Sequence, residues 1–296
     1  MNDSFSSYHP IVNFVYFALV LLFSMFFMHP VGLVISFVSS FIWSTYLGGK
    51  KAIKFNLLYM IPTLIVTALV NPAFNHEGIT ILSYLPSGNP LTLESITYGI
   101  AAATMLVTVI CWFSCYNAIM TSDKFVYLFG RIIPALSLIF SMVLRFVPKF
   151  KAQIKIVSNS QKCLGRDVSN GSVFNRAKHG MHILSIMITW ALENAIETAD
   201  SMKSRGYGLP ERTAFSIYKF DSRDKIAMWT IGGIGSFILL SGLSGQLYWR
   251  YFPSMKGVNF SIWSVIVFVA YFCLCITPYV IDILEDRKWK LTKSNI

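Results

Sequence analysis

The middle of this 296-residue chain contains two similar phrases: Ser160-Gln161-Lys162-Cys163-Leu164-Gly165-Arg166-Asp167 and Asp200-Ser201-Met202-Lys203-Ser204-Arg205-Gly206-Tyr207. Each phrase follows a run with helical periodicity and reaches a glycine, the residue at which helices commonly end. The surrounding residues 122–225 hold 16 of the 25 Lys and Arg and 8 of the 14 Asp and Glu, which gives them +8 of the net charge of +11. The pattern predicts a basic helical insert between long apolar segments.

The composition is that of a membrane protein. Hydrophobic residues make up 54% of the chain and charged residues 13%, with a mean hydropathy of +0.56, whereas soluble domains carry about 25% charged residues. Nucleic acid is not an expected partner, because the basic residues interleave with apolar helix faces and form no continuous basic groove. The five cysteines show neither zinc nor disulfide spacing, so no metal site is predicted.

Six apolar runs are predicted to cross the membrane as helices. They cover residues 11–28, 31–47, 55–70, 96–119, 226–243 and 261–283.

Loop charges predict the orientation of these spans. The basic segments are residues 50–54, the insert and residues 287–290, whereas the loops 71–95 and 246–260 carry only Arg250 and Lys256. Basic loops face the cytoplasm, so both termini and the insert are expected there. The predicted protein is all-α, with six transmembrane helices and a cytoplasmic insert of amphipathic helices between spans four and five. Its predicted divisions are residues 1–121, 122–225 and 226–296.

The first part of the insert is predicted to lie at the inner membrane surface. Residues 132–144 are apolar, but about 13 residues are too few to cross a bilayer. Prolines interrupt helices, so breaks are expected near Pro134 and at Pro148. An amphipathic helix with a basic face should then cover residues 149–164 and end at Gly165.

A second long helix is predicted from about residue 175 to residue 205. Ala191, Ala195 and Ala199 fall on one face together with Leu184, Ile188 and Met202. Small residues let helices approach closely, so this face is expected to cross another helix. The arginine near each helix end either presents donors to an acidic partner groove or merely follows the helix dipole and the lipid charge.

No catalytic apparatus is visible in the sequence. The chain lacks a G-x-x-x-x-G-K-[ST] phosphate loop, and no Asp, Glu, Lys or Arg lies in the middle of its six predicted spans. His179 and His182 lie three residues apart with no third ligand nearby, so a surface helix explains them better than a metal. The chain is therefore expected to be non-catalytic and not to hydrolyse ATP by itself.

Four motifs in order resemble the transmembrane T component of energy-coupling factor (ECF) transporters, the EcfT/CbiQ family. The run ending Arg145-Phe146-Val147-Pro148 is similar to the family's Arg-Phe-x-Pro. Residues 161–167 resemble the first Ala-Arg-Gly signature, Ser204-Arg205-Gly206 resembles the second, and Asp224 fits the acidic residue before the next span. The resemblance covers nearly the whole chain.

This resemblance implies a coupling subunit in the membrane of a bacterial cell. Two cytoplasmic ABC-type ATPases would bind ATP and Mg, and a separate substrate-binding S component would carry the vitamin or metal ion. Two coupling helices would cross, and their signature residues would dock on the ATPases. This chain would bind no cofactor and would contact the lipid bilayer, the ATPases and the S component.

One position departs from the family pattern. Leu164 stands where the first signature has arginine, and Arg166 follows two residues later. Either Arg166 takes over the contact or the helix docks through Cys163 and Leu164. The alternative function is an ABC-importer permease that forms the substrate path itself, although such a permease normally docks through one short coupling helix. A membrane enzyme or assembly factor is a third reading, for which no catalytic set is visible.

Overall fold

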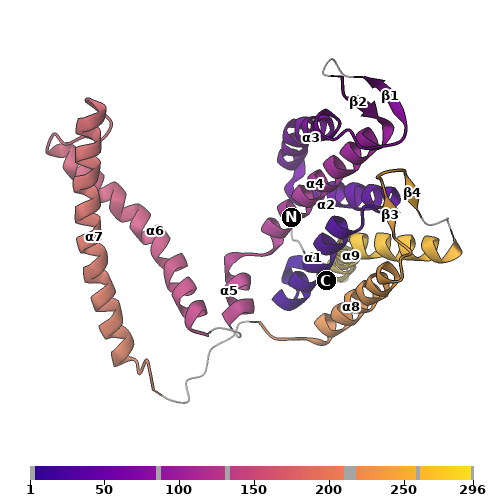
Figure 1. Ribbon diagram of the computed structural model, residues 1–296. Coiled ribbons are helices and arrows are strands. Elements are labelled where there is room, and N and C mark those ends of the chain that lie inside the picture. The colour runs from indigo at the N-terminus through magenta and orange to yellow at the C-terminus, as the bar shows by residue number, and fades with distance from the viewer. Residues whose placement is uncertain (1–3, 85–87, 131–133, 210–217, 258–260, 295–296) are drawn as a thin grey trace. The chain divides into compact units, whose positions relative to one another are not determined.

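The computed structural model describes residues 4–84, 88–130, 134–209, 218–257 and 261–294 (Figure 1). The chain forms two compact units. Met1–Lys124 and Tyr218–Ile296 make one, which we call the bundle unit, and Phe125–Ile217 make the other, which we call the hairpin unit. The second unit is thus inserted into the chain of the first.

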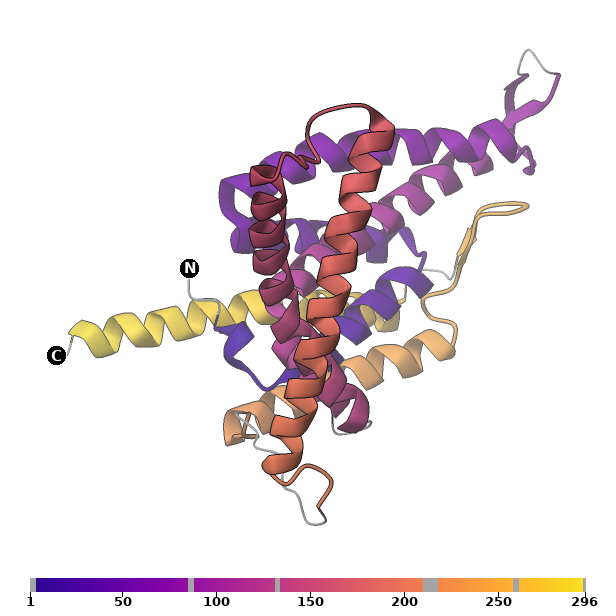
Figure 2. The ribbon, with the colours of Figure 1, turned by 90° about the vertical axis from the view of Figure 1, so that its left-hand side faces the viewer.

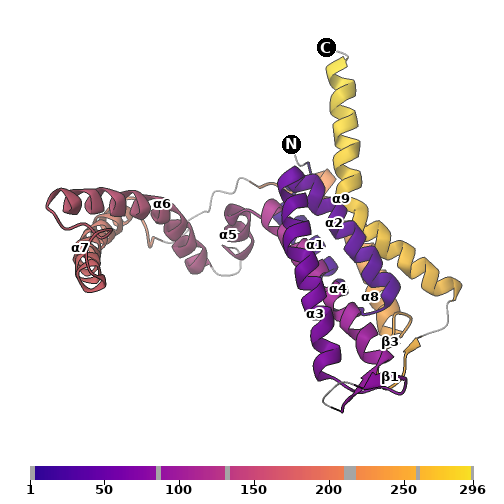
Figure 3. The ribbon, with the colours of Figure 1, turned by 90° about the horizontal axis from the view of Figure 1, so that it is seen from above.

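The bundle unit consists of helices joined by short connections. Two of its loops contain an antiparallel pair of short strands, β1 with β2 and β3 with β4. Figure 3 shows the bend in α9, which contains Pro278. In chain order the elements are η1 (Phe5–Ser7), α1 (Pro10–Phe26), α2 (Pro30–Phe55), η2 (Asn56–Met60), α3 (Ile61–Phe74), β1 (Ile81–Tyr84), β2 (Pro90–Thr92), α4 (Leu93–Ile119), α8 (Ser222–Leu243), β3 (Trp249–Arg250), β4 (Lys256–Gly257) and α9 (Ile262–Ser294).

The first two helices begin with the same cap. Nδ1 of His9 accepts a hydrogen bond from the N–H of Ile11, and Nδ1 of His29 accepts one from the N–H of Val31, both at 3.3 Å. A proline follows each histidine, and proline suits the first turn because an N–H there would have no helical partner. The His-Pro pair at residue 29 therefore separates α1 from α2, at the gap between the predicted spans 11–28 and 31–47.

Four continuous helical stretches among the described residues are long and apolar enough to cross a membrane, starting at residues 30, 93, 222 and 262. The first covers Pro30–Phe74, and its backbone leaves helical geometry at Gly49. Nδ2 of Asn56 lies 3.1 Å from Oγ of Ser44, 12 residues earlier, which a straight helix would place about 18 Å away. The chain therefore turns back at Gly49, within α2 and before α3 begins. The protein is a multi-pass α-helical membrane protein, and the count of six spans stays a prediction, since α1 has 17 residues.

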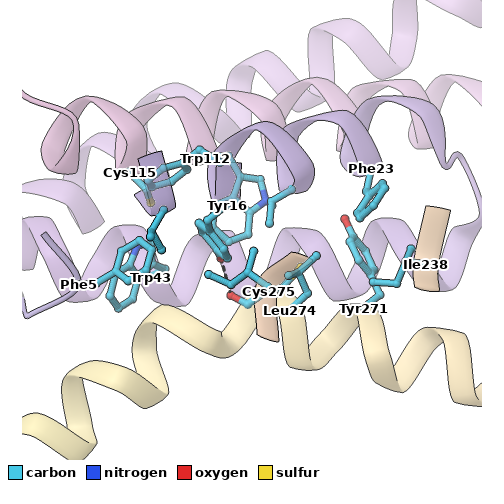
Figure 4. Packing of buried hydrophobic residues seen from close by; sticks show 14 of the residues in the cluster. Phe5, Tyr16, Phe23, Trp43, Trp112, Cys115, Ile238, Tyr271, Leu274 and Cys275 are labelled. Atoms are coloured by element: carbon cyan, nitrogen blue, oxygen red, sulfur yellow. Dashed lines mark hydrogen bonds between the residues drawn. The ribbon is translucent and has the colours of Figure 1, made fainter. Parts of the chain in front are cut away.

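An aromatic core holds α1, α2, α4, α8 and α9 together (Figure 4). The hydroxyl of Tyr16 donates to the carbonyl oxygen of Cys275 at 3.0 Å, and its ring meets Trp112 edge to face with centroids 6.2 Å apart. Oγ of Ser24 lies 2.7 Å from Oγ of Ser36 and 3.2 Å from the hydroxyl of Tyr271. Polar groups in a membrane protein bond to one another because lipid offers them no partner.

Buried carboxylates hold residues 5–9, which we call the N-terminal clasp. Oδ1 of Asp282 in α9 accepts a hydrogen bond from the N–H of Phe5 at 2.9 Å. Oδ1 of Asp224 at the start of α8 accepts one from the N–H of His9 at 3.0 Å. Both carboxylates are almost wholly buried. Burial of the His9 ring also lowers the pKa of this histidine, which favours its neutral form.

The clasp also contacts the chain where the hairpin unit begins and ends. Nζ of the buried Lys124 donates to the carbonyl oxygens of Ser6 and Ile119. On the returning chain, the ring of Phe220 packs edge to face on His9 with centroids 5.0 Å apart. Lys124 and Phe220, which flank the hairpin unit in the chain, therefore both contact the same short segment of the bundle unit.

The hairpin unit is built from two long helices with a small core. Figure 1 shows α6 and α7 meeting where α6 ends and spreading apart toward their other ends, and Figure 2 shows α7 lying along α6. Val157 of α6 packs with Ile183 and Met187 of α7. The rings of Phe150 and Trp190 meet edge to face at 5.2 Å. The elements are α5 (Ser122–Gly130), α6 (Pro134–Cys163) and α7 (Val173–Ser204).

The predicted break at Pro148 is wrong. α6 continues without interruption through Pro148, whereas the break expected near Pro134 borders residues 131–133, which lie outside the described residues. A proline inside a helix removes one hydrogen bond and crowds the preceding turn, but aromatic contacts lie on either side of Pro148. Phe146 and Phe150 lie one turn apart with ring centroids at 6.3 Å, and Phe150 is fixed on Trp190 of α7. Packing against a second helix therefore outweighs the local preference.

Candidate docking site at two helix ends

α6 ends in a Schellman motif at Gly165. This glycine has φ of +77°, a left-handed conformation that glycine adopts without steric cost. The N–H of Gly165 donates to the carbonyl oxygen of Lys162, and the N–H of Arg166 donates to that of Gln161, both at 3.0 Å. These bonds satisfy carbonyl groups that a helix end would otherwise leave without a partner.

α7 ends in the same motif at Gly206. Its φ is +79°. The N–H of Gly206 donates to the carbonyl oxygen of Lys203, and the N–H of Tyr207 donates to that of Met202, both at 3.0 Å. The two similar phrases of the sequence therefore fold into the same backbone structure.

The shared motif fixes which side chains correspond. Leu164 precedes one glycine and Arg205 precedes the other, and both side chains are exposed. Arg166 follows the first glycine, where the second end has Tyr207. Leu164, rather than Arg166, is thus the counterpart of Arg205 in position. Cys163 and Ser204 are the exposed residues one step further into each helix.

The end of α6 has an apolar tip and an engaged arginine. The Leu164 side chain is 69% exposed. Nη1 of Arg166 lies 3.1 Å from Nε2 of His182 on α7. The N–H of Ser169 donates to Asp167 at 2.9 Å and lowers the pKa of that carboxyl, with a smaller contribution from Lys162. The contact with His182 therefore directs the Arg166 side chain toward α7.

The end of α7 lies beside a cavity of about 490 Å³ between α6 and α7. Lys149, one of the lining residues, contacts two groups of α7. Its Nζ donates to Oδ1 of Asn194 and lies 5.3 Å from the Trp190 ring centre. The cavity is lined by Leu138, Met142, Arg145, Phe146, Lys149, Asn194, Glu197, Thr198, Ser201, Met202, Arg205, Gly206 and Tyr207.

The cavity brings two sequence motifs together. Arg145 and Phe146 belong to the Arg-Phe-x-Pro motif, and Arg205 and Gly206 to the second signature. Pro148 of the first motif is exposed and is not among the lining residues. Positions 60 residues apart in the chain therefore share one surface.

The alanine face of α7 lies away from α6. Ala195 and Ala199 are exposed, and Ala191 is half-buried. The contact with α6 runs through Ile183 and Met187, about 100° round the helix from the alanines at 100° per residue. The alanines therefore do not form the α6–α7 contact, and their role in a helix crossing stays a prediction.

Sequence reasoning missed several groups at these ends. His182 was interpreted as a plain surface residue, yet it holds Arg166. The pairing of Lys149 with Asn194 and Trp190 was also not predicted. Helical periodicity assigns each residue to a face, but it does not show which faces of two helices meet. Among the described residues, no group of three or more His, Cys, Asp or Glu could hold a metal ion.

Comparison with known proteins identifies the family. The model of the CbiQ family, described as cobalt transport protein, matches residues 4–215. The energy-coupling factor transporter transmembrane protein EcfT of Lactobacillus helveticus is 34% identical over 109 residues, which cover 36% of this chain and 37% of the relative. EcfT of Lacticaseibacillus paracasei is 31% identical over 36% of this chain and 39% of its own length.

A longer match extends over most of the chain. EcfT of Streptococcus equi is 25% identical over 215 residues, 70% of this chain and 77% of the relative. The first two relatives are matched over less than half of their own lengths. The family match alone spans well over half of the present chain. The chain therefore belongs to the CbiQ cobalt transport protein family, and it is similar to the transmembrane proteins of energy-coupling factor transporters.

Proposed function

We propose that this chain couples ATP hydrolysis by two cytoplasmic ABC-type ATPases to the movement of a separate substrate-binding membrane subunit. One observation carries the proposal: α6 and α7 end in the same Schellman motif, each with an exposed side chain just before its glycine. Two equivalent tips on one unit suit two similar partner subunits. ATP and Mg²⁺ would bind to the ATPases, and this chain would supply the mechanical connection.

The tips offer different chemistry to their partners. Arg205 presents a planar guanidinium, which suits a carboxylate in a partner groove. Leu164 presents an apolar side chain at the corresponding position, and its 69% exposure leaves it free to be buried by a partner. We therefore assign the first contact to Leu164 and treat Arg166 as a support for the α6 end.

The face of α7 turned away from α6 suits the substrate-binding subunit. Its apolar side chains recur at helical spacing and are more than half exposed, which is typical of a surface that contacts another protein or lipid. The face comprises Met181 at 66%, Leu184 at 52%, Ile188 at 52% and Leu192 at 62%, followed by the exposed Ala195 and Ala199.

The orientation of the chain follows from its charges. With the hairpin unit and both termini in the cytoplasm, the strongly basic segments lie on the inner side. A cysteine at Ser169 should then react with a membrane-impermeant thiol reagent only from the inside, and one at Ser83 in β1 only from the outside. The native cysteines are first replaced, and reaction of Ser169→Cys from outside would reverse the orientation.

Purification of the tagged chain from its own cells tests the function as a whole. Mass spectrometry should find two ATPase subunits and a separate small membrane protein, and vesicles containing all of them should take up substrate when ATP is supplied. Uptake by this chain with ATPases alone would instead indicate a permease that forms the substrate path itself.

A further inference from the structure

The Arg-Phe-x-Pro motif has no role in the function proposed above, yet its arginine lies at the docking end of α7. Arg145 and Arg205 line the same cavity of about 490 Å³, together with Gly206 and Tyr207 of the second signature. Two arginines that are far apart in the sequence therefore line one space.

The charge in this cavity is unbalanced. Its lining holds three cations, Arg145, Lys149 and Arg205, against one carboxylate, Glu197. Lys149 already donates to Asn194 and lies over Trp190. Within the described part of the chain, neither Arg145 nor Arg205 makes a salt bridge, and both side chains are exposed. The cavity therefore has two arginines whose charge is available to an anion from outside.

We propose that Arg145 and Arg205 form one composite site for an acidic side chain of the ATPase that docks at the end of α7. This inference rests on the proposed coupling function and adds a second anchoring residue to it. Arginine binds carboxylates through two parallel hydrogen bonds, so two arginines on one cavity can hold an acidic side chain from two helices at once.

The occupant is assigned from position and charge. A partner that reaches Arg205 at the helix tip also reaches the cavity beside it, and Arg145 lines that cavity from α6. Because the arginines come from different helices, an acidic group between them links α6 to α7. A movement of the ATPase would then be transmitted to α6 and α7 together.

Binding of purified ATPases to the chain in lipid nanodiscs tests this site. Arg145→Ala should weaken binding by about tenfold or more, as expected for loss of a charged contact at an interface, and Arg145→Lys should restore part of it. Lys155→Ala, on the same helix but not among the lining residues, is the matched control and should bind within about twofold of wild type. The double variant with Arg205→Ala should lose less than the product of the two single losses, because both side chains hold one group.

The outcomes separate this inference from the function on which it rests. No loss of binding in Arg205→Ala contradicts the proposed docking itself. A loss in Arg205→Ala with none in Arg145→Ala, or strictly multiplicative losses, overturns the composite site alone. An Arg145→Ala loss that disappears in nanodiscs of neutral lipid would assign the cavity to an anionic lipid headgroup and would also overturn it. Unchanged thermal unfolding of Arg145→Ala should accompany the expected result.

Discussion

The ends of α6 and α7 share a backbone but differ in their side chains. Each closes with a glycine at positive φ and the same two hydrogen bonds. Leu164 tips one end, and its neighbouring arginine is turned back onto His182. Arg205 tips the other, beside a cavity that contains a second arginine. A Schellman motif fixes where a side chain is presented, whereas the residue itself decides which partner surface it suits.

The largest difference should appear on removal of Arg205. Loss of one member of a charged pair at an interface costs about 2–5 kcal/mol, because the other member stays buried without a partner. Arg205→Ala should abolish uptake and release the ATPases, and Arg205→Lys should recover only part because a point charge cannot replace the planar fork. Uptake and ATPase pull-down measure this, with Arg176→Ala as a control at the opposite end of α7. Normal uptake and normal ATPase retention in Arg205→Ala would contradict the proposed docking role of Arg205.

The α6 end should respond to a change of polarity rather than to loss of charge. Leu164→Asp should reduce ATPase retention strongly, since it places a charge where a partner buries an apolar group. Arg166→Ala should have a mild effect, about threefold or less, because only the contact with His182 is lost. The same pull-down compares both variants. A severe Arg166→Ala defect beside a mild Leu164→Asp defect would make Arg166 the docking residue.

Substitutions on the two faces of α7 should also have different effects on stability and uptake. Ala195→Leu should leave the thermal unfolding of the purified chain unchanged, because the exposed Ala195 does not contact α6. It should nevertheless reduce uptake, since extra volume holds a partner helix away from a small-residue face. By contrast, Met187→Ala creates a void in the hairpin core and should lower stability by about 2–5 kcal/mol. Normal uptake by Ala195→Leu would remove the predicted helix crossing.

Alanine at either glycine tests whether the caps are equivalent. A non-glycine residue in left-handed geometry costs roughly 1–2 kcal/mol, so both variants should increase hydrogen exchange at the affected helix end. Gly206→Ala should have the slightly larger effect, because its Cβ would lie 3.1 Å from Cδ1 of Leu209, whereas the space at Gly165 is open. A response at only one glycine would show that the caps do not contribute equally.

The smallest effect should be a pH dependence at the α6 end. Hydrogen bonding of Ser169 lowers the pKa of Asp167 in the folded chain. The resulting stabilisation is fully present above the unfolded pKa and is lost as the pH falls through the folded value. Hydrogen exchange near residue 167 should therefore increase in acid, and Asp167→Asn should remove this pH dependence.

Local features of the fold could be predicted from the sequence. Gly165 was expected to end its helix, because a helix end depends on neighbouring backbone geometry. The gap between the predicted spans 11–28 and 31–47 lies where α1 gives way to α2. The predicted break at Pro148 was wrong. The continuous helix packs through Phe150 on Trp190, which lies 40 residues later in the chain and could not be paired with it from the sequence.

The pairing of surfaces could not be predicted. On α7, Ile183 with Met187 and Leu184 with Ile188 are both apolar pairs at helical spacing, and nothing local decides which pair faces α6. The cavity containing Arg145 and Arg205 depends on that choice. The docking tips were therefore visible in the sequence as motifs, whereas the space beside one of them was not.

The N-terminal clasp places a constraint on biosynthesis. The N–H of Phe5 bonds to Asp282, which is synthesised 277 residues later. Lys124 becomes available midway through synthesis and Asp224 only after the whole hairpin unit has been made. The clasp can therefore close only after α9 has been synthesised, so the contacts of residues 5–9 form late in the assembly of the bundle unit.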